Sequence, residues 1–269
     1  MKISFIGGGN MARALIGGLL AQGWAAGNIC VVESDPAKGE ELRRDFGIEV
    51  AEGLPRAAGA DIIVLAVKPQ QLRDVAIFLG SLLKDQLLIS IAAGIRSSDL
   101  IRWLGGYAAV VRVMPNTPAL VQCGASALYA APGASPAQRE QAENVLAAVG
   151  STVWLADEAQ MDAVTAISGS GPAYVFYFIE AMQQAALELG LSGEQARALS
   201  LQTFLGASQL ALQRSETPDV LRTQVTSKGG TTERALNRMQ ELGVKPAIVQ
   251  AIHAAAERSR ELGDLLGKD

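Results

Sequence analysis

Short, mostly apolar runs alternate with helical patterns through the first half of the chain. The runs lie at residues 2–6, 28–33, 61–67, 86–91 and 110–113. Residues 11–21 have helical spacing, Asp35 followed by Pro36 is typical of a helix start, and Ser97 or Ser98 is expected to cap a later helix. Strands that alternate with helices in this way predict an α/β fold with a doubly wound parallel sheet.

The second half of the chain has a helical pattern only. Residues 158–168 and 173–189 are two helical stretches, and no strand pattern follows Trp154. The other helices are expected to begin at Ser192, Thr217, Thr231 and Lys245. Ser135 and Ser192 are each followed three residues later by Gln, which is the pattern of a capping box. We therefore expect two domains, at residues 1–160 and 161–269, with the second all-helical.

The stretch at residues 173–189 is strongly apolar and rich in alanine. Such a helix needs cover on most of its circumference, and a small helical domain cannot easily provide it alone. A partner chain would supply the missing cover. We therefore expect a homodimer or a larger assembly built on dimers.

The composition excludes several classes of protein. Hydrophobic residues make up 49% of the 269 residues, which is enough for a sizeable core. The net charge is −4 and lysine and arginine do not cluster, so we expect no nucleic-acid partner. No uninterrupted run of roughly 18 apolar residues occurs, and a glycine turn breaks the apolar N-terminus. A cytoplasmic protein with no membrane partner is therefore expected.

Few residues suit metal or thiol chemistry. Cys30 and Cys123 are the two cysteines, they form no CxxC pair, and His253 is the single histidine. Metal sites and disulfide frameworks need clusters of such residues. We therefore expect no metal, two reduced cysteines and no histidine relay.

A glycine-rich turn follows the first expected strand. Gly7, Gly9 and Ala12 form the spacing GxGxxA between a strand and a helix. The first glycine permits the tight turn, the second lets a pyrophosphate approach the backbone, and the small third residue allows close helix–strand packing. The helix N-terminus then faces the phosphates. This pattern predicts a Rossmann-type dinucleotide-binding domain.

The end of the second expected strand bears on the choice of coenzyme. Glu33 lies where an acidic side chain bonds the ribose 2′-hydroxyl of NAD. Ser34 is suited to donate to the 2′-phosphate of NADP, but no arginine directly follows it. Arg43 and Arg44 fit a solvated helix face. The residues alone leave both coenzymes open.

Small residues and prolines follow three later strands, at residues 66–70, 92–94 and 114–118. Ligands of open α/β sheets bind beyond the carboxyl ends of the strands, so these turns are expected at the ligand edge. Together they would shape a slot for a flat ring. Each turn alone also fits an ordinary strand end.

A donor-rich segment lies in the helical half. Residues 225–232 read Val-Thr-Ser-Lys-Gly-Gly-Thr-Thr and precede a helix. Glycines and hydroxyls before a helix N-terminus present hydrogen-bond donors to an anion. The distance in sequence from the glycine turn favours a substrate carboxylate over a second phosphate. The alternative is a helix cap with a flexible lead-in.

Several segments, in this order, resemble the pyrroline-5-carboxylate reductases. They are residues 6–12, 66–70, 114–118, 166–174 and 225–232. The specific parts are Ser-Gly-Ser-Gly-Pro-Ala-Tyr at 168–174 and the segment 226–232, since the glycine turn is shared with many dehydrogenases. The resemblance implies an N-terminal Rossmann domain at 1–160 and a helical substrate-binding and dimerisation domain at 161–269.

The resemblance also implies the reaction and its site. Such an enzyme transfers hydride from NADPH, with NADH as an alternative, to 1-pyrroline-5-carboxylate and forms L-proline, the last step of proline biosynthesis. The implied cofactor contacts are Ile6, Gly7, Gly8, Gly9, Asn10, Met11, Ser34, Ala66, Val67, Lys68, Pro69, Ile91, Ala92 and Ala93. The implied substrate contacts are Glu216, Ser227, Gly229, Gly230, Thr231 and Thr232.

Little acid–base chemistry is expected from the protein itself. Orientation of the two rings should dominate, and good positioning lowers a barrier by roughly 7–11 kcal/mol. Thr232 is the candidate catalytic residue, as hydrogen-bond partner of the substrate ring nitrogen. Glu216 would stabilise positive charge there, and Lys68 is either a cofactor contact or an acid.

Two positions depart from the family pattern, and rival functions of two classes, other enzymes and a regulator, are open. Lys228 stands where the family usually has proline, and Gly53 where many members carry a polar residue. The same architecture serves other imine reductases and β-hydroxyacid dehydrogenases, but the latter need a lysine on the long helix, and residues 173–189 contain none. A dinucleotide-sensing regulator would be expected to have a degraded substrate loop, whereas residues 229–232 are intact.

Overall fold

The structure is a computed structural model, and it describes residues Met1–Lys268. These residues form two compact units. The first unit contains Met1–Ser170 and the residues from Ala255 onward, and the second contains Gly171–Ala254. The expected division between residues 160 and 161 precedes this break, and it keeps the C-terminal residues with the second domain.

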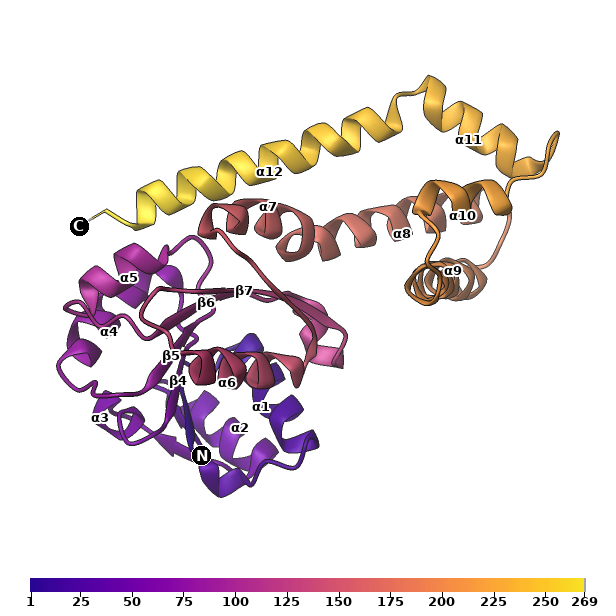
Figure 1. Cartoon of the computed structure of the whole chain (residues 1–269). Helices are drawn as coiled ribbons and strands as arrows, with labels where there is room; N and C mark the ends of the chain where they lie inside the picture. Colours follow the sequence, from indigo (N-terminus) through magenta and orange to yellow (C-terminus); the bar gives the residue numbers. More distant parts are fainter. Residues whose placement is uncertain (269) are drawn as a thin grey trace. The chain divides into compact units, whose positions relative to one another are not determined.

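An eight-stranded sheet lies at the centre of the first unit (Figure 1). Its strands are β1 (Ile3–Ile6), β2 (Ile29–Val32), β3 (Glu49–Ala51), β4 (Ile62–Leu65), β5 (Leu87–Ser90), β6 (Val110–Met114), β7 (Gly124–Ala130) and β8 (Gly150–Trp154). Their order in the sheet is β3-β2-β1-β4-β5-β6-β7-β8. The first six strands of this order have the arrangement of a Rossmann fold, which confirms the predicted α/β architecture.

Three strands were not anticipated, and one of them changes the character of the sheet. All neighbouring strands are parallel except β6 and β7, which are antiparallel, so the sheet is mixed rather than wholly parallel. β7 has the sequence Gly-Ala-Ser-Ala-Leu-Tyr-Ala, whose small residues have little strand propensity. β3 has three residues, and Glu49 among them is exposed. Pairing with their neighbours, rather than local sequence, makes these segments strands.

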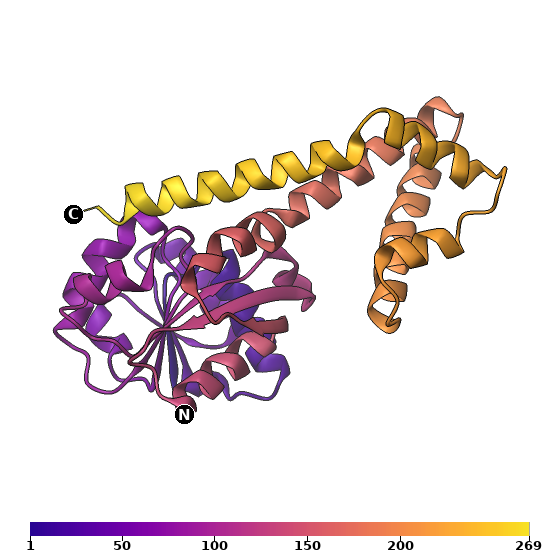
Figure 2. The same ribbon diagram turned by 45° about the horizontal axis from the view of Figure 1, so that its top comes forward.

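Two layers of helices cover the sheet (Figure 2). The helical segments of the first unit are α1 (Asn10–Ala21), η1 (Ala26–Asn28), α2 (Pro36–Phe46), α3 (Leu54–Ala57), α4 (Pro69–Gly80), α5 (Ser97–Trp103), η2 (Thr117–Val121), α6 (Pro136–Ala147), η3 (Glu158–Gln160), α7 (Met161–Val164) and η4 (Thr165–Gly169). One core contains residues of α1, α2 and α6, and the other contains residues of α3, α4 and α5. Phe5 belongs to the first core and Ile6 to the second, because successive strand side chains point to opposite faces.

The start of α5 differs from the expectation that Ser97 or Ser98 caps it. Arg96 stands at the N-cap position without a side-chain hydrogen bond, and Ser97 is already helical. The backbone N–H of Ser97 donates to Oε1 of Glu158 at 2.6 Å, and its hydroxyl donates to the other carboxylate oxygen. A carboxylate from a distant segment therefore takes the place of the predicted serine cap.

The expected helix at residues 158–168 is divided into η3, α7 and the π-helical turn η4. The N–H of Ser170 donates to the carbonyl of Thr165, five residues back. The hydroxyl of Ser168 bonds the carbonyl four residues before it, and the side-chain amide of Asn116 donates to the Ser168 carbonyl at 3.1 Å. Such local and tertiary hydrogen bonds compete with regular helical bonds and favour a widened turn.

All the regular secondary structure among the described residues of the second unit is helical. Its helices are α8 (Gly171–Glu188), α9 (Gly193–Gln213), α10 (Pro218–Gln224), α11 (Thr231–Glu241) and the first part of α12 (Val244–Leu266). Both predicted capping boxes are present, at Ser192 for α9 and at Ser135 for α6. In the described part of the chain, no helix combines the length and the apolar character needed to cross a membrane.

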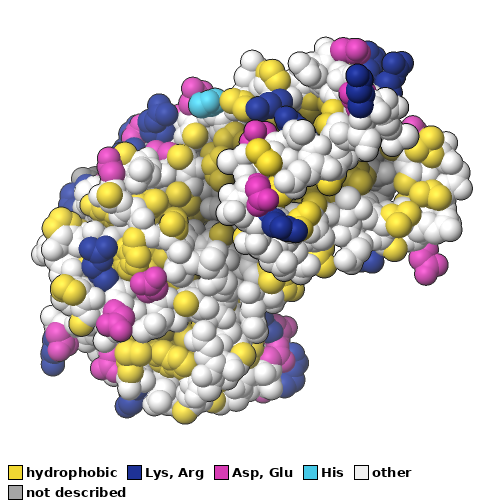
Figure 3. Space-filling model, turned by 45° about the vertical axis from the view of Figure 1, so that its right-hand side comes forward, with side chains coloured by type: hydrophobic (Ala, Val, Ile, Leu, Met, Phe, Trp, Pro, Cys, Tyr) yellow, Lys and Arg dark blue, Asp and Glu magenta, His cyan; other side chains and the backbone are white. Residues whose placement is uncertain are grey.

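Helix α8 has no buried residue. Phe176 is 65% exposed and Tyr177 is 72% exposed. Leucines of α9 are also exposed, among them Leu205. Hydrophobic side chains of this unit accordingly reach the surface in Figure 3. The single chain therefore leaves uncovered the apolar helix for which a partner was predicted.

The C-terminal part of α12 belongs to the first unit. The hydroxyl of Ser259 donates to Oδ1 of Asp162 at 2.7 Å, and Arg96 pairs with Asp264. Ser259 is buried. Residues from the end of α12 therefore complete the surface of a unit that begins at the other end of the chain.

Candidate active site

The two outer glycines of the first turn have different structural roles. Gly7 has a φ of +99°, and a Cβ atom on it would lie 2.8 Å from the carbonyl oxygen of Ala66. The fold itself therefore requires glycine at this position. Gly9 has a φ of −71°, and a Cβ on it would meet no atom within 4 Å. Neither backbone strain nor a close neighbour therefore requires glycine at position 9, and the backbone there is open to close approach by a ligand.

Helix α1 begins directly after this turn with unsatisfied backbone donors. Gly9 is its N-cap and provides no side-chain hydrogen bond, and its first turn contains no acidic residue. The first N–H groups of a helix have no partner within the helix, and the helix dipole favours negative charge beside them. This N-terminus is therefore suited to the pyrophosphate of a dinucleotide.

A cavity of about 460 Å³ lies beyond the carboxyl ends of β1, β2 and β4. The predicted cofactor residues that line it are Ile6, Gly7, Gly8, Gly9, Ser34, Ala66, Val67 and Lys68. Its other lining residues are Val32, Glu33, Asp35, Lys38, Glu52, Leu54, Gln71 and Val75. The structure therefore brings four segments that are distant in sequence together around one cavity, at the edge of the sheet where Rossmann folds bind dinucleotides.

The remaining predicted cofactor residues lie outside the lining of this cavity. Asn10 and Met11 are in the first turn of α1, and Pro69 is the first residue of α4. Residues 91–93 follow β5, which pairs with β4, so they lie at the same edge of the sheet. Of these three, Ala92 is buried and Ala93 is exposed.

Glu33 and Asp35 organise the loop after β2. Oε2 of Glu33 accepts from the N–H of Gly8, and its Oε1 accepts from the N–H of Asp35, both at 2.9 Å. Asp35 caps α2 by accepting from the N–H groups of Ala37 and Lys38. The hydrogen bond from the Lys38 N–H holds the pKa of the Asp35 carboxyl below its ordinary value. Two carboxylates therefore occupy backbone donors at the cavity.

Sequence reasoning identified Glu33 and the cap at Asp35, but it missed Glu52 as a lining residue. Glu52 directly follows β3. The pattern of the chain did not reveal that strand, so no sequence signal placed Glu52 near the glycine turn.

The predicted substrate loop forms a tight turn before α11. Gly229 has a φ of +74°, and the N–H of Gly230 donates to the carbonyl of Ser227 at 3.0 Å. Gly230 is the N-cap of α11 and provides no side-chain hydrogen bond. Oε2 of Glu233 accepts from the N–H of Gly229 at 2.7 Å. The helix N-terminus itself therefore keeps free donors for an anion.

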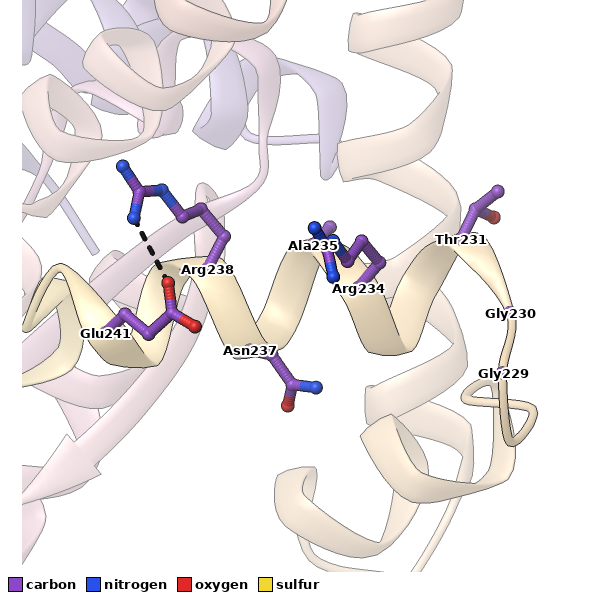
Figure 4. A pocket seen from close by; sticks show the side chains of 8 residues that line it. All are labelled: Gly229, Gly230, Thr231, Arg234, Ala235, Asn237, Arg238 and Glu241. Carbon is purple, nitrogen blue, oxygen red and sulfur yellow. Dashed lines mark hydrogen bonds and ion pairs between the residues drawn. The ribbon is translucent and has the colours of Figure 1, made fainter.

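A cavity of about 770 Å³ lies along this loop and α11 (Figure 4). It is lined by Gly229, Gly230, Thr231, Arg234, Ala235, Asn237, Arg238 and Glu241. Figure 4 shows Thr231 at the start of α11 and the ion pair between Arg238 and Glu241. The two charged atoms of this pair lie 3.1 Å apart. Arg234 was not predicted; it lies on the same helix as the threonines and adds positive charge near the loop.

The other predicted substrate residues, Glu216, Ser227 and Thr232, do not line this cavity. Thr231 and Thr232 are both exposed. Among the hydrogen bonds of the described residues, neither threonine hydroxyl takes part. Both hydroxyls are therefore available to a ligand.

Other groups with chemical potential lie away from the two cavities. Among the described residues, no group of three or more His, Cys, Asp and Glu side chains could hold a metal ion. Cys30 is buried, and burial raises the pKa of its thiol, whereas Cys123 is exposed. Neither cysteine lines the dinucleotide cavity or the α11 cavity.

Two family models match this chain. The model described as pyrroline-5-carboxylate reductase dimerisation matches residues 158–262. The model described as NADP oxidoreductase coenzyme F420-dependent matches residues 2–94. The two matches fall on the helical half and on the half with the glycine turn, respectively.

Relatives and solved structures agree with these matches over almost the full chain. The chain is 50% identical to a pyrroline-5-carboxylate reductase of Pseudomonas aeruginosa, covering 99% of this chain and 98% of that protein. It is similar to the solved pyrroline-5-carboxylate reductase of Coxiella burnetii, with a TM-score of 0.92 and 40% identity over 97% and 98% of the two chains. The Plasmodium falciparum pyrroline carboxylate reductase with NADP bound has a TM-score of 0.88 and 29% identity over 98% of each chain. The chain belongs to the pyrroline-5-carboxylate reductase family.

Proposed function

We propose that this protein reduces 1-pyrroline-5-carboxylate to L-proline with a reduced nicotinamide coenzyme. The observation that carries the proposal is that a glycine-rich turn leads into a helix N-terminus without a side-chain cap at two places, α1 and α11. The reaction needs two anions to be held, the coenzyme pyrophosphate and the substrate carboxylate. Each N-terminus is preceded by glycines that give one of these anions access to backbone N–H groups.

The proposed coenzyme site includes every residue that the family resemblance implies in the first unit. The turn at Gly7–Gly9 and the first turn of α1 hold the pyrophosphate, and Ser34 lies at the adenosine end. Residues 66–69 and 91–93 lie beyond β4 and β5 and are suited to orient the nicotinamide. When bound, the reduced nicotinamide supplies the hydride that adds to the imine carbon.

The proposed substrate site lies in the second unit. The free N–H groups at the start of α11 hold the substrate carboxylate, with the hydroxyls of Ser227 and Thr231. Gly229 and Gly230 shape the turn beside it, since their own N–H groups donate to Glu233 and Ser227. The exposed Thr232 hydroxyl is then free to hydrogen-bond the ring nitrogen, which takes the electron pair of the C=N bond as that bond is reduced. Glu216 is half-buried before α10 and would favour a protonated nitrogen. The protein thus orients the imine and stabilises charge at its nitrogen.

The proposal extends to organisation and location. Residues 1–160 would bind the dinucleotide, and residues 161–269 would bind the substrate and join two chains. The uncovered α8 and the dimerisation model that matches residues 158–262 support a dimer-based assembly. We also propose that the protein works in the cytoplasm, which agrees with two free cysteines.

The test is a reaction with purified protein, 1-pyrroline-5-carboxylate and either NADH or NADPH. Absorbance at the reduced-nicotinamide band should fall, and proline should accumulate in equal amount. A reaction without substrate and one without protein are the controls. If neither coenzyme gives proline above these controls, the proposed function is wrong.

A further inference from the structure

The adenosine end of the dinucleotide cavity is lined mainly by negative charge. Glu33, Asp35 and Glu52 line it there, with Lys38 as the cation near them. Among the lining residues that the structure describes, none is an arginine. A 2′-phosphate at this end would therefore meet three carboxylates and one ammonium group.

Glu33 already binds one backbone donor of the turn after β1 and one of the loop after β2. Its carboxylate accepts from Gly8 and from Asp35, each at 2.9 Å. A Cβ on Gly8 would lie 2.5 Å from a methyl carbon of Leu42 and 3.1 Å from Oε2 of Glu33, so glycine is needed for this approach. The carboxylate is thereby fixed at the end of β2, and its remaining lone pairs can accept from a ribose hydroxyl.

The N-terminus of α2, the other nearby anion-binding group, is occupied by Asp35. Its Oδ1 accepts from the N–H of Ala37 at 3.0 Å and from that of Lys38 at 3.4 Å. The ammonium of Lys38 lies 3.6 Å from the same carboxylate. The helix N-terminus and its neighbouring cation are therefore already neutralised by a carboxylate of the chain.

The arginines that follow in sequence have other partners. Arg43 pairs with Glu40 at 3.3 Å and donates to the carbonyl of Val50 at 3.0 Å. Arg44 pairs with Asp45 at 3.0 Å, and Arg56 pairs with Glu49. None of these three arginines lines the cavity, so none is placed to bind a 2′-phosphate.

We propose that Glu33 and Asp35 make the cavity select NADH over NADPH. Glu33 accepts from the 2′-hydroxyl of the ribose, whereas a 2′-phosphate is repelled by both carboxylates and finds the donors of α2 taken. NADPH still binds through its pyrophosphate and nicotinamide, so both coenzymes serve, with NADH bound more tightly. This inference rests on the proposed function, because it assumes that the cavity holds the coenzyme.

The test compares two ligands that differ only in the 2′ group. Binding of ADP and of 2′-phospho-ADP to the full-length protein is measured by titration calorimetry. We expect ADP to bind at least about tenfold more tightly, since like charges a few ångströms apart repel strongly in a partly buried site. Equal affinities, or tighter binding of 2′-phospho-ADP, would overturn the inference and leave the proposed function standing. If neither ligand binds while the protein still forms proline, the inference fails, because this cavity then does not hold the adenosine end, and the proposed function stands.

Three variants connect the preference to the residues. Asp35→Ser keeps a helix-capping side chain and removes the charge, so the preference for ADP should shrink by about threefold or more. Glu33→Gln should weaken the binding of ADP and strengthen the binding of 2′-phospho-ADP. Glu140→Gln makes the same change at an exposed position of α6, outside the cavity, and should alter neither affinity.

The same variants distinguish selection from a structural role. If Glu33 only stabilises the loop, Glu33→Gln weakens the binding of both ligands equally. This result would refute the part of Glu33 in coenzyme selection. If Asp35→Ser has the same ratio of ADP affinity to 2′-phospho-ADP affinity as Glu140→Gln, the role of Asp35 in selection is refuted. The ratio of kcat/KM for NADH to kcat/KM for NADPH should move in parallel with the affinity ratio.

Discussion

Valine at position 9 tests the dinucleotide site with little disturbance of the fold. Gly9 has ordinary backbone angles, and a Cβ on it would meet nothing within 4 Å. The remaining cost is that of a poorer N-cap residue, which is at most about 1 kcal/mol. In a chain of this size such a loss lowers the melting temperature by only about 2–4 °C.

The effect on coenzyme binding should be much larger. The valine methyl groups would occupy the space that the pyrophosphate needs in order to reach the N–H groups of α1. A hydrogen bond to a charged group contributes about 1.5–3 kcal/mol, so the loss of two weakens binding by about 3 kcal/mol or more. This corresponds to at least about a hundredfold rise in the Kd for NADH.

Calorimetric titration with NADH and thermal unfolding are measured on the same preparations. Gly27→Val is the matched control, because a Cβ there also meets nothing within 4 Å and Gly27 does not line the cavity. Gly7→Ala is the opposite case, since its φ of +99° and the contact with Ala66 predict a loss of at least about 1–2 kcal/mol in stability. If Gly9→Val binds NADH as tightly as the parent, the reasoning is refuted and Gly9 is only a turn residue.

Three further predictions follow from the second unit and from one surface ion pair. Thr232→Ala should lower kcat/KM about tenfold to hundredfold at unchanged melting temperature and NADH affinity; a lower melting temperature with unchanged kcat/KM would refute the substrate role. Sedimentation at micromolar concentration should show dimers or larger assemblies, and a folded monomer would contradict the role given to α8. Hydrogen bonds from Arg56 lower the pKa of Glu49 below its ordinary value of 4.5. This ion pair therefore stabilises the fold above pH 4.5, and the stabilisation is lost as the pH falls through the lowered pKa. The urea midpoint of Glu49→Gln should therefore depend less on pH in this acidic range than that of Glu140→Gln. Equal pH dependence of the two variants would contradict the stabilising role of the Arg56–Glu49 pair.

The strands that were predicted correctly are those whose local sequence alone indicates a strand. β4 reads Ile-Ile-Val-Leu and is buried along its whole length, so apolar continuity alone indicates a strand. β7 lies between β6 and β8 and is defined by hydrogen bonds to both. Its small residues would fit a loop equally well. Pairing over long sequence distances is therefore the information that the pattern lacked.

The candidate site likewise contains residues that the sequence alone can identify and contacts that only the folded chain creates. Gly7 was predictable because its residue type reports the left-handed backbone that the turn needs there. Gly9 was chosen from its spacing after Gly7, and its contact with the coenzyme stays a prediction. The bonds from Glu33 to Gly8 and to Asp35 depend on how two loops approach each other. Glu52 enters the cavity lining from a strand that was not predicted. The charge around the coenzyme is therefore a property of the assembled sheet edge.

The return of α12 to the first unit has a consequence for how the chain folds during synthesis. A ribosome makes the chain from its N-terminus, and domains generally fold as they emerge. Asp162 and Arg96 then have no contact with their partners Ser259 and Asp264 until the whole second unit has been synthesised. During that interval the first unit exposes a surface that α12 later covers. The nascent dinucleotide-binding unit is therefore expected to become resistant to proteases only after residue 264 has left the ribosome.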